Sequence, residues 1–311
     1  MARPRNRLID YLVYLAVRVA GLLSHMSSPE MNRLGARWAG RLIWTLDRPH
    51  RRIALGHLRR SFPEWPEGRI RRVARESFEH LACLGLEVLL APRLITAATW
   101  RRHIRLVNMA ETVRMLTRQE SGLVVLTGHF GNWEIISYMM ATLGFPTVSV
   151  ARPLDNPHLN ELILGVRERT GQTILHKRGA TESMSDVIER GGVLAFLADQ
   201  DAGRKGLFVD FFGRSASTHR SVGLLATHYG VPVVIGYGRR LGGAFRFEVG
   251  IRRIIRPPEW AGRADPVTWI TRTFTAELEG IVREAPAQYL WAHRRWKHRP
   301  DGTRAGGDGV A

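Results

Sequence analysis

The stretch GLVVLTGHFGNWE, residues 122–134, decides how the centre of this chain folds. Residues 123–127 form a short apolar run between glycines, which is typical of a buried strand. Asn132 is a good helix N-cap, and the apolar residues after it recur at helical spacing. The two glycines of the turn allow the backbone to bend tightly between strand and helix. The sequence therefore predicts a strand, a turn that carries His129, and a helix.

The same pattern of apolar strand and amphipathic helix continues along the chain. Expected strands lie at 146–151, 172–176, 193–200, 231–238 and 245–250, and expected helices at 133–144, 156–171, 181–192, 219–230 and 266–283. This alternation predicts an α/β fold with a mixed, partly parallel sheet flanked by helices. Residues 1–118 are mostly helical in pattern, so the sheet is preceded by a helical N-terminal region.

We expect one main domain, because the sequence shows neither internal repeats nor a convincing linker. It covers residues 27–301, with a helical part to about 118 and an α/β core over 119–301. Residues 1–26 form a separate membrane-associating helix. The glycine-rich tail, residues 302–311, is predicted to be disordered.

The composition indicates anionic partners and a reducing compartment. The 311 residues include 46 Lys and Arg against 28 Asp and Glu, a net charge of +18. Such a charge suits nucleic acid, acidic lipid headgroups or an acidic protein. Cys83 is the one cysteine, so an intrachain disulfide is excluded, and its apolar surroundings predict a free buried thiol.

The N-terminal segment has the features of a helix that lies in a membrane interface. Its apolar run covers residues 8–23 but contains Asp10 and Arg18, and it is shorter than the roughly 20 apolar residues that a span needs. Arginines lead it, which suits an interfacial helix; an ordinary core helix is the alternative. The arginine-rich helix expected at 47–60 either faces anionic headgroups or is a solvated face.

Two strand ends carry polar residues, and sites in α/β sheets gather at the carboxyl ends of strands. The first is the turn with His129, and the second is ADQDAGRKG, residues 198–206. Glu134 falls in the first turn of the expected helix, and a carboxylate beside a histidine fixes its tautomer and raises its basicity. The pair therefore predicts a general base, although a structural polar loop has the same spacing.

Several motifs together resemble a known family. GHFGNWE at 128–134 looks like the His-four-residues-acid motif of the glycerolipid, or lysophospholipid, acyltransferase superfamily. With the further motifs, the chain is similar to the lipid A biosynthesis lauroyl and myristoyl acyltransferases over about residues 5–301. Glu134 replaces the commoner Asp, as is usual in this branch. The further motifs are FPE at 62–64, ARPLDNP at 151–157, ADQDAGRKGLFVDFFGRSASTHR at 198–220 and YLWAHRRWKHRP at 289–300.

The resemblance implies an enzyme that moves a fatty acyl chain from acyl carrier protein, or from coenzyme A, to a hydroxyl of a glycolipid. A lipid A precursor is the favoured acceptor. His129 would deprotonate the hydroxyl, with Glu134 orienting the base. The sequence has no GxSxG elbow that would favour a covalent acyl-enzyme. The resemblance implies no metal and no cofactor beyond the thioester donor, and it places the enzyme at the cytoplasmic face of the inner membrane.

The resemblance also implies residues that bind substrate. The arginines would hold acceptor phosphate or the phosphopantetheine arm of the carrier. The carboxylates would position the acceptor or hold an active-site arginine, and the threonine would donate to an anionic group. Packing is the expected role of Trp291 and Trp296. The predicted substrate-binding residues are Arg152, Arg167, Arg169, Asp199, Asp201, Thr218, Arg294 and Arg295.

Three alternatives remain at this level. The acceptor could be another glycolipid, such as a mannosylated phosphatidylinositol. The chain could be a non-enzymatic basic protein that binds a membrane or nucleic acid. It could also be a metal hydrolase built on His129, Glu134 and Asp199. The favoured partners are acyl carrier protein, an anionic membrane surface and the glycolipid acceptor, and nucleic acid is not expected.

Overall fold

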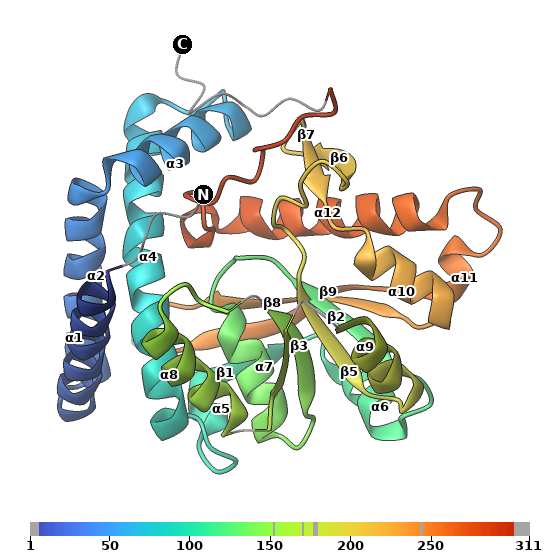
Figure 1. Ribbon diagram of the computed structural model, residues 1–311, viewed down its shortest axis with the longest axis horizontal. Coiled ribbons are helices and arrows are strands. Elements are labelled where there is room, and N and C mark those ends of the chain that lie inside the picture. The colour runs from blue at the N-terminus through green and yellow to red at the C-terminus, as the bar shows by residue number, and fades with distance from the viewer. Residues whose placement is uncertain (1–5, 152, 170, 177–179, 243–244, 302–311) are drawn as a thin grey trace.

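The computed structural model describes residues 6–151, 153–169, 171–176, 180–242 and 245–301 (Figure 1). Its centre is a seven-stranded sheet of order β1-β9-β8-β2-β5-β3-β4. Neighbouring strands are parallel except β8 and β9, so the predicted mixed, partly parallel α/β sheet is confirmed. The strands are β1 (Ile104–Val107), β2 (Leu123–Thr127), β3 (Thr147–Ala151), β4 (Thr173–His176), β5 (Val193–Leu197), β8 (Val233–Arg240) and β9 (Phe247–Ile255).

Helices cover both faces of this sheet because its inner strands are apolar on both sides. In β2, Val124 belongs to a core with α10 and α12, whereas its neighbour Leu123 belongs to a second core with α7. Because side chains alternate between the two faces of the sheet, each face is covered by its own layer of helices. The helices around the sheet are α5 (Trp100–His103), α6 (Ala110–Arg118), α7 (Trp133–Thr142), α8 (Pro157–Glu168), α9 (Ala180–Glu189), α10 (Ser221–Tyr229), α11 (Pro257–Trp260) and α12 (Pro266–Glu284), with a short 3-10 turn η1 (Pro286–Gln288).

The N-terminal helices stand together at one side of the sheet (Figure 1). They are α1 (Arg7–Met26), α2 (Pro29–Leu46), α3 (Arg48–Ser61) and α4 (Glu67–Leu94), so the predicted helical region is confirmed. The long α4 packs against α2, where a Cβ on Gly40 would lie 2.4 Å from the Cα of Glu79. Only glycine allows this close helix contact. Cys83 on α4 is buried, as expected.

Several short elements were not predicted from the sequence. The segment after β5, in which no strand was expected, contains an antiparallel hairpin of β6 (Leu207–Phe211) and β7 (Arg214–Thr218). The first 118 residues also contain β1, which pairs with β9 at the edge of the sheet. All three strands are short; β1 pairs with β9, which is remote in sequence, whereas β6 and β7 pair with each other across the turn at Phe212 and Gly213. The predicted disordered tail lies outside the described residues.

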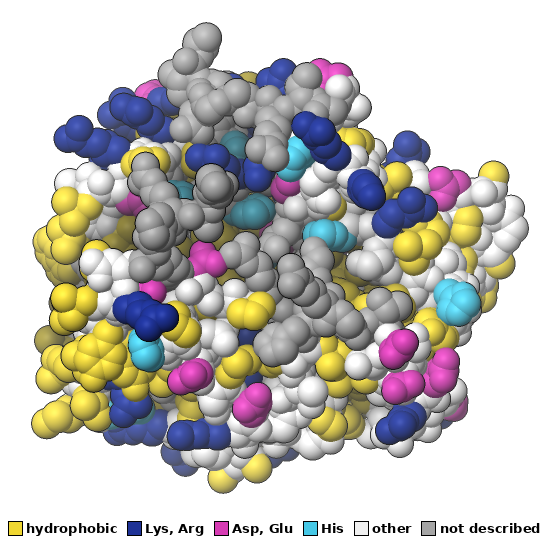
Figure 2. Space-filling model, in the orientation of Figure 1, with side chains coloured by type: hydrophobic (Ala, Val, Ile, Leu, Met, Phe, Trp, Pro, Cys, Tyr) yellow, Lys and Arg dark blue, Asp and Glu magenta, His cyan; other side chains and the backbone are white. Residues whose placement is uncertain are grey.

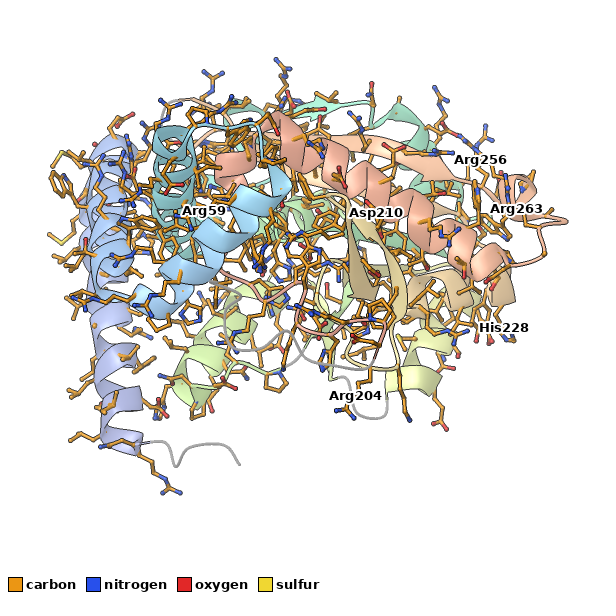
Figure 3. The ribbon with its side chains drawn as sticks, turned by 90° about the horizontal axis from the view of Figure 1, so that it is seen from above. Arg59, Arg204, Asp210, His228, Arg256 and Arg263 are labelled. Atoms are coloured by element: carbon orange, nitrogen blue, oxygen red, sulfur yellow. The ribbon has the colours of Figure 1, made fainter. Side chains whose placement is uncertain are left out.

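The outer sides of α1 and α2 expose apolar side chains. Figure 2 shows them gathered along the edge of the molecule formed by these helices, and Figure 3 shows them projecting outward. Within the described residues, α1 is the helix long and apolar enough to cross a membrane, and little of it is buried. It is therefore not a core helix. The exposed residues include Leu8, Leu12, Leu15, Val19, Leu22 and Leu23 on α1, and Met31, Leu34, Trp38, Leu42 and Leu46 on α2.

Candidate active site

The turn between β2 and α7 is held in place by two distant segments. Gly131 donates its backbone N–H to the carbonyl of Gln288 at 2.8 Å, and Leu290 donates to the carbonyl of His129 at 3.0 Å. Gly131 has φ +58°, and a Cβ there would lie 1.9 Å from the carbonyl oxygen of Gly238 on β8. Glycine is therefore required at this position. The C-terminal segment after α12 therefore closes the turn.

His129 is paired with Asp199, which follows β5 at the same edge of the sheet. The Nδ1 atom of His129 lies 2.7 Å from one carboxylate oxygen, and its backbone N–H donates to the other at 2.8 Å. Both side chains are buried, with 9% and 3% exposed. Burial alone would raise the pKa of Asp199, but the facing His129 holds it well below its usual range. The carboxylate therefore stays ionised and keeps the proton of the imidazole on Nδ1.

With Nδ1 protonated, the Nε2 atom of His129 carries the free lone pair. The side-chain amide of Gln200 lies 3.3 Å from Nε2 and is oriented to donate to it. The ring of His293 stacks at 6.1 Å from that of His129, and Trp133 packs edge-on at 5.0 Å. Burial lowers the pKa of His293 to about 4, so it is neutral at pH 7. Nε2 is thus the atom available to accept a proton.

Glu134 does not orient His129, contrary to the prediction. Arg167 on α8 binds both carboxylate oxygens of Glu134, at 2.9 Å and 2.6 Å, and the indole of Trp133 donates to one of them at 3.1 Å. The reason is the direction of α7, which points Glu134 toward α8 while Trp133 packs against the imidazole. The predicted Arg167 is therefore close to the site, but as the partner of Glu134.

A buried polar network supports the turn from behind. Arg240 on β8 binds Glu87 on α4 at 2.6 Å and 2.7 Å, and Asn132 donates to the same carboxylate at 2.8 Å. His80 donates from Nε2 to the carbonyl of Gly131 at 2.9 Å, and its Nδ1 faces Arg240. Burial, together with the positive charge of Arg240, lowers the pKa of His80 to about 3. The network fixes the turn that presents His129.

This network was missed from the sequence. The available signal was Glu87 itself, a carboxylate inside the apolar run LGLEVLLA at 84–91 of a helix. A charge in such a run is buried only when it is paired. The partner of Glu87 is Arg240, which lies 153 residues further along the chain, so no local sequence pattern identifies it.

Two predicted phosphate-binding residues are instead part of the interior. Arg295 is only 1% exposed, and it donates to the backbone carbonyls of Gln200 and Ser217 and to the hydroxyl of Thr218. Thr218 is fully buried. The prediction that these two side chains contact an acceptor is therefore wrong. Arg295 holds the loop after β5 against β7, which positions Asp199 indirectly. The buried Trp291 and Trp296 confirm the predicted packing role.

The remaining predicted residues lie at different places. Asp201 binds the ring of His298 at 2.7 Å and does not reach His129. Arg169 lies at the end of α8, facing α1 and α4. Arg294 lines a cleft beside His293. Arg152 lies outside the described residues.

The cleft beside His293 has a volume of about 770 Å³ and is lined by residues of α2, α3, α4, the loop after β5 and the segment after α12. Its walls combine cationic and apolar side chains with the carboxylates of Asp47 and Asp201. One end carries His293, Arg294 and Lys297. The other end is formed by Ile43, Phe78, Leu81 and Ala82 of α2 and α4, with His50 of α3 between the ends. An amphiphilic molecule fits such a cleft.

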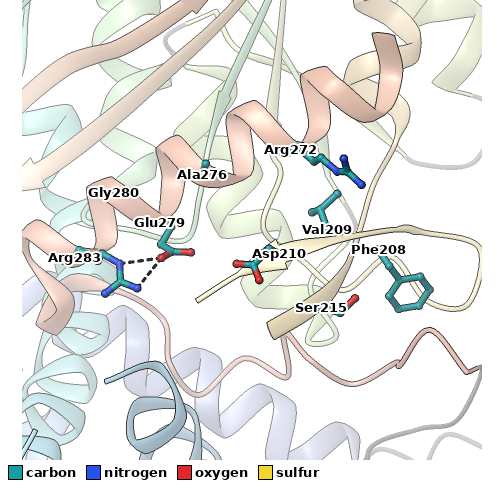
Figure 4. Close-up of a pocket in the computed structure, with 9 residues that line it drawn as sticks. All are labelled: Phe208, Val209, Asp210, Ser215, Arg272, Ala276, Glu279, Gly280 and Arg283. Atoms are coloured by element: carbon teal, nitrogen blue, oxygen red, sulfur yellow. Dashed lines mark hydrogen bonds and ion pairs between the residues drawn. The ribbon is translucent and has the colours of Figure 1, made fainter. Parts of the chain in front are cut away.

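A second hollow, of about 710 Å³, lies between α12 and the β6–β7 hairpin (Figure 4). Glu279 and Arg283 are paired along one side of it, and Arg272 lies at the other end. Neither His129 nor Asp199 lines this hollow. They do not line the cleft beside His293 either, but His293 lines that cleft and its ring stacks 6.1 Å from the ring of His129. This cleft is therefore the candidate for the reacting groups.

The comparison with known families agrees with this geometry. A sequence model of the family described as bacterial lipid A biosynthesis acyltransferase matches residues 2–298. The chain belongs to this family. It is an acyltransferase, and its family acts in acyl transfer to glycolipids. The alternative of a non-enzymatic basic protein is thereby overturned.

Two of the similar proteins cover nearly the whole chain, and a third covers a part of it. The lipid A biosynthesis lauroyltransferase of Escherichia coli (strain K12) is 27% identical over 301 residues, covering 94% of each chain. The lipid A biosynthesis palmitoleoyltransferase of the same organism is 25% identical over 307 residues, covering 94% of this chain and 93% of its own. A phosphatidylinositol mannoside acyltransferase of Mycobacterium tuberculosis (strain ATCC 25618 / H37Rv) is 27% identical over 133 residues, 37% of this chain and 42% of its own.

The metal hydrolase alternative does not match the positions of its three ligands. His129 and Asp199 bind each other, whereas Glu134 is bound by Arg167 on the far side of Trp133. Among the residues that the structure describes, no three His, Cys, Asp or Glu side chains gather as a metal site would require.

Proposed function

We propose that this acyltransferase moves a fatty acyl chain from an acyl carrier protein or coenzyme A thioester to a hydroxyl of a lipid A precursor. The observation that carries the proposal is the 2.7 Å contact between Nδ1 of His129 and Asp199. This contact leaves Nε2 as a base beside the amphiphilic cleft, within a family of lipid A biosynthesis acyltransferases. A histidine held by a buried carboxylate is a competent general base.

In the proposed reaction, Nε2 of His129 takes the proton of the acceptor hydroxyl. The hydroxyl oxygen attacks the thioester carbonyl, and the C–S bond breaks as the tetrahedral intermediate collapses. The proton on His129 then passes to the departing thiolate. Asp199 keeps the imidazole in the required tautomer and stabilises the imidazolium that forms between the two steps. The amide of Gln200, which lies at Nε2, yields its place to the hydroxyl.

The cleft beside His293 is the proposed acceptor site. Its apolar end meets α2 near Ile43, which is exposed on the apolar edge of the molecule, so a lipid could enter from a bilayer. Its other end presents Arg294 and Lys297 for the phosphate of the acceptor. The acyl groups of the acceptor would then lie along α2 and α4, with the sugar hydroxyl next to His129.

The donor is proposed to approach on the Glu134 side. A small apolar slot lies there, lined by Trp133, Phe196 and Leu197, with Glu134 and Arg167 at its border. Glu134 holds Arg167 through two hydrogen bonds, which fixes the direction of the guanidinium. A fixed cation beside the reacting centre would bind the phosphate of the donor's phosphopantetheine arm or the developing oxyanion.

The membrane and the acidic carrier protein are the proposed partners. The exposed apolar sides of α1 and α2 support attachment to the cytoplasmic face of the inner membrane, with α1 lying in or crossing the bilayer. The net charge of +18 supports attraction to anionic lipids and to an acidic carrier protein.

A mannosylated phosphatidylinositol is the second candidate acceptor. The partial similarity to the Mycobacterium tuberculosis enzyme favours it, because that relative is named for such a substrate. Both candidates combine a sugar hydroxyl, a phosphate and acyl chains. The geometry of the cleft suits this shared chemistry.

The experiment is acyl transfer by the purified full chain in detergent. Carrier protein loaded with several chain lengths, and the matching coenzyme A thioesters, are offered with a lipid A precursor or a mannosylated phosphatidylinositol. Mass spectrometry then detects an acceptor heavier by one acyl chain. His129→Ala should abolish this product, while His228→Ala on α10 (Figure 3) should leave it unchanged. Acyl transfer by His129→Ala at the rate of the unmodified protein contradicts the proposal.

A further inference from the structure

A groove separate from the acceptor cleft lies where α1, α4 and α8 meet. Its volume is about 440 Å³. Each helix contributes residues at helical spacing, so one face of each is turned toward the groove. The lining residues are Val17, Arg18, Gly21, Leu22 and His25 of α1, Leu89, Pro92 and Arg93 of α4, and Leu162, Val166 and Arg169 at the end of α8.

Three arginines border the groove, one from each helix, without a bound carboxylate. Arg18 contacts the hydroxyl of Tyr14 at 3.4 Å, and Arg93 donates to the backbone carbonyl of His25. In the described part of the chain, none of Arg18, Arg93 and Arg169 forms an ion pair with Asp or Glu. Three cations at one groove repel each other unless an anion lies between them.

The floor between these cations is apolar. Leu22, Leu89, Leu162 and Val166 provide it, and Gly21 leaves room beside Leu89. The groove opens next to α1, whose outer side exposes apolar residues over most of its length. A ligand with a phosphate and a hydrocarbon chain matches both the charge and the lining.

We propose that this groove binds one anionic phospholipid of the membrane. The phosphate lies among Arg18, Arg93 and Arg169, and one acyl chain lies along the apolar floor. The bound lipid joins α1 to the body of the enzyme, because α1 itself is mostly exposed. It also fixes the end of α8, the helix whose Arg167 binds Glu134. The site is distinct from the acceptor cleft, which lies between α2, α3 and α4 beside His293.

The test is native mass spectrometry of the full chain, delipidated in detergent and then mixed with palmitoyl-oleoyl phosphatidylglycerol or phosphatidylcholine. One phosphatidylglycerol should remain bound per chain, and phosphatidylcholine should not. A groove variant, R18Q/R93Q/R169Q, should bind this lipid with an affinity lower by tenfold or more, which corresponds to about 1.4 kcal/mol. The matched control R7Q/R72Q/R114Q loses the same charge from exposed arginines that line no part of the groove and should retain the lipid.

A second variant tests the shape without altering charge. At Gly21 a Cβ would lie 3.5 Å from Leu89, so Gly21→Leu places a side chain in the groove without a clash at its base. It should also abolish retention of phosphatidylglycerol, whereas His129→Ala should retain it. Equal retention by the groove variant, the exposed control and the unmodified chain overturns the proposal. Retention by Gly21→Leu together with loss by both arginine variants also overturns it, because binding then follows net charge alone.

Discussion

Replacing Asp199 by Asn tests the mechanism most directly, because the change removes a charge while nearly preserving the shape. In the structure the two carboxylate oxygens accept from the backbone N–H of His129 at 2.8 Å and from its Nδ1 at 2.7 Å. An asparagine has one acceptor oxygen. If that oxygen serves the backbone N–H, the amide NH₂ group faces Nδ1 and donates to it. The imidazole then carries its proton on Nε2, which is the wrong tautomer for a base.

The expected loss follows from this exchange. A wrong tautomer in a histidine–aspartate pair lowers kcat by about 10⁴. The fold should lose one charge-assisted hydrogen bond, roughly 1.5–3 kcal/mol of unfolding free energy. Because burial of Asp199 is nearly complete, solvent cannot replace the lost bond. The activity loss should therefore far exceed the stability loss.

Initial rates of acyl transfer at saturating donor, with urea unfolding of the same samples, measure both quantities. Asp201→Asn is the matched control, since Asp201 is in the same loop but binds His298. It should lose far less activity than Asp199→Asn. A folded Asp199→Asn enzyme whose kcat stays within about tenfold, or 1.4 kcal/mol, of the unmodified enzyme refutes the role given to Asp199.

Three further predictions concern the ion pair, the turn and the buried histidine. Glu134→Gln releases Arg167 and should reduce acyl transfer by about 10–100-fold while leaving the pair of His129 and Asp199 intact. The Arg167→Gln/Glu134→Gln double variant should show the same loss, because the two residues act as a pair. Additive losses in the double variant would contradict this coupling. Gly131→Ala should prevent folding, seen as loss of soluble protein, because the added Cβ would lie 1.9 Å from a backbone oxygen. Gly144→Ala is the control: its Cβ has open space, so the positive φ should lower the free energy of unfolding by only about 1 kcal/mol. His80 has a folded pKa of about 3, below its usual 6.5, so the unfolded chain binds more protons between these values. The contribution of neutral His80 to the free energy of unfolding should therefore be fully present above pH 6.5 and fall by about 1.4 kcal/mol per pH unit below it. Urea unfolding at several pH values should find a smaller slope in His80→Gln. An identical slope in this variant and the unmodified protein would contradict the prediction.

The sequence by itself determined the family and most of the strands and helices along the chain. Local patterns predicted the β2–turn–α7 unit because an apolar run, two glycines and an N-cap are all adjacent in the chain. The same locality identified His129 as the candidate base. The β6–β7 hairpin and β1 were missed because their stability depends on pairing and packing, which a short segment does not display.

The tertiary structure decided which carboxylate binds His129. Glu134 is close to His129 in sequence, yet helix geometry directs it to Arg167, 33 residues further along the chain. Asp199 is 70 residues from His129, but β2 and β5 are adjacent parallel strands, and their carboxyl ends bring the two side chains to 2.7 Å. Strand order is a property of the whole sheet, because each strand pairs with segments that are remote in sequence. Asp199 could therefore be identified as the partner of His129 only from the assembled sheet.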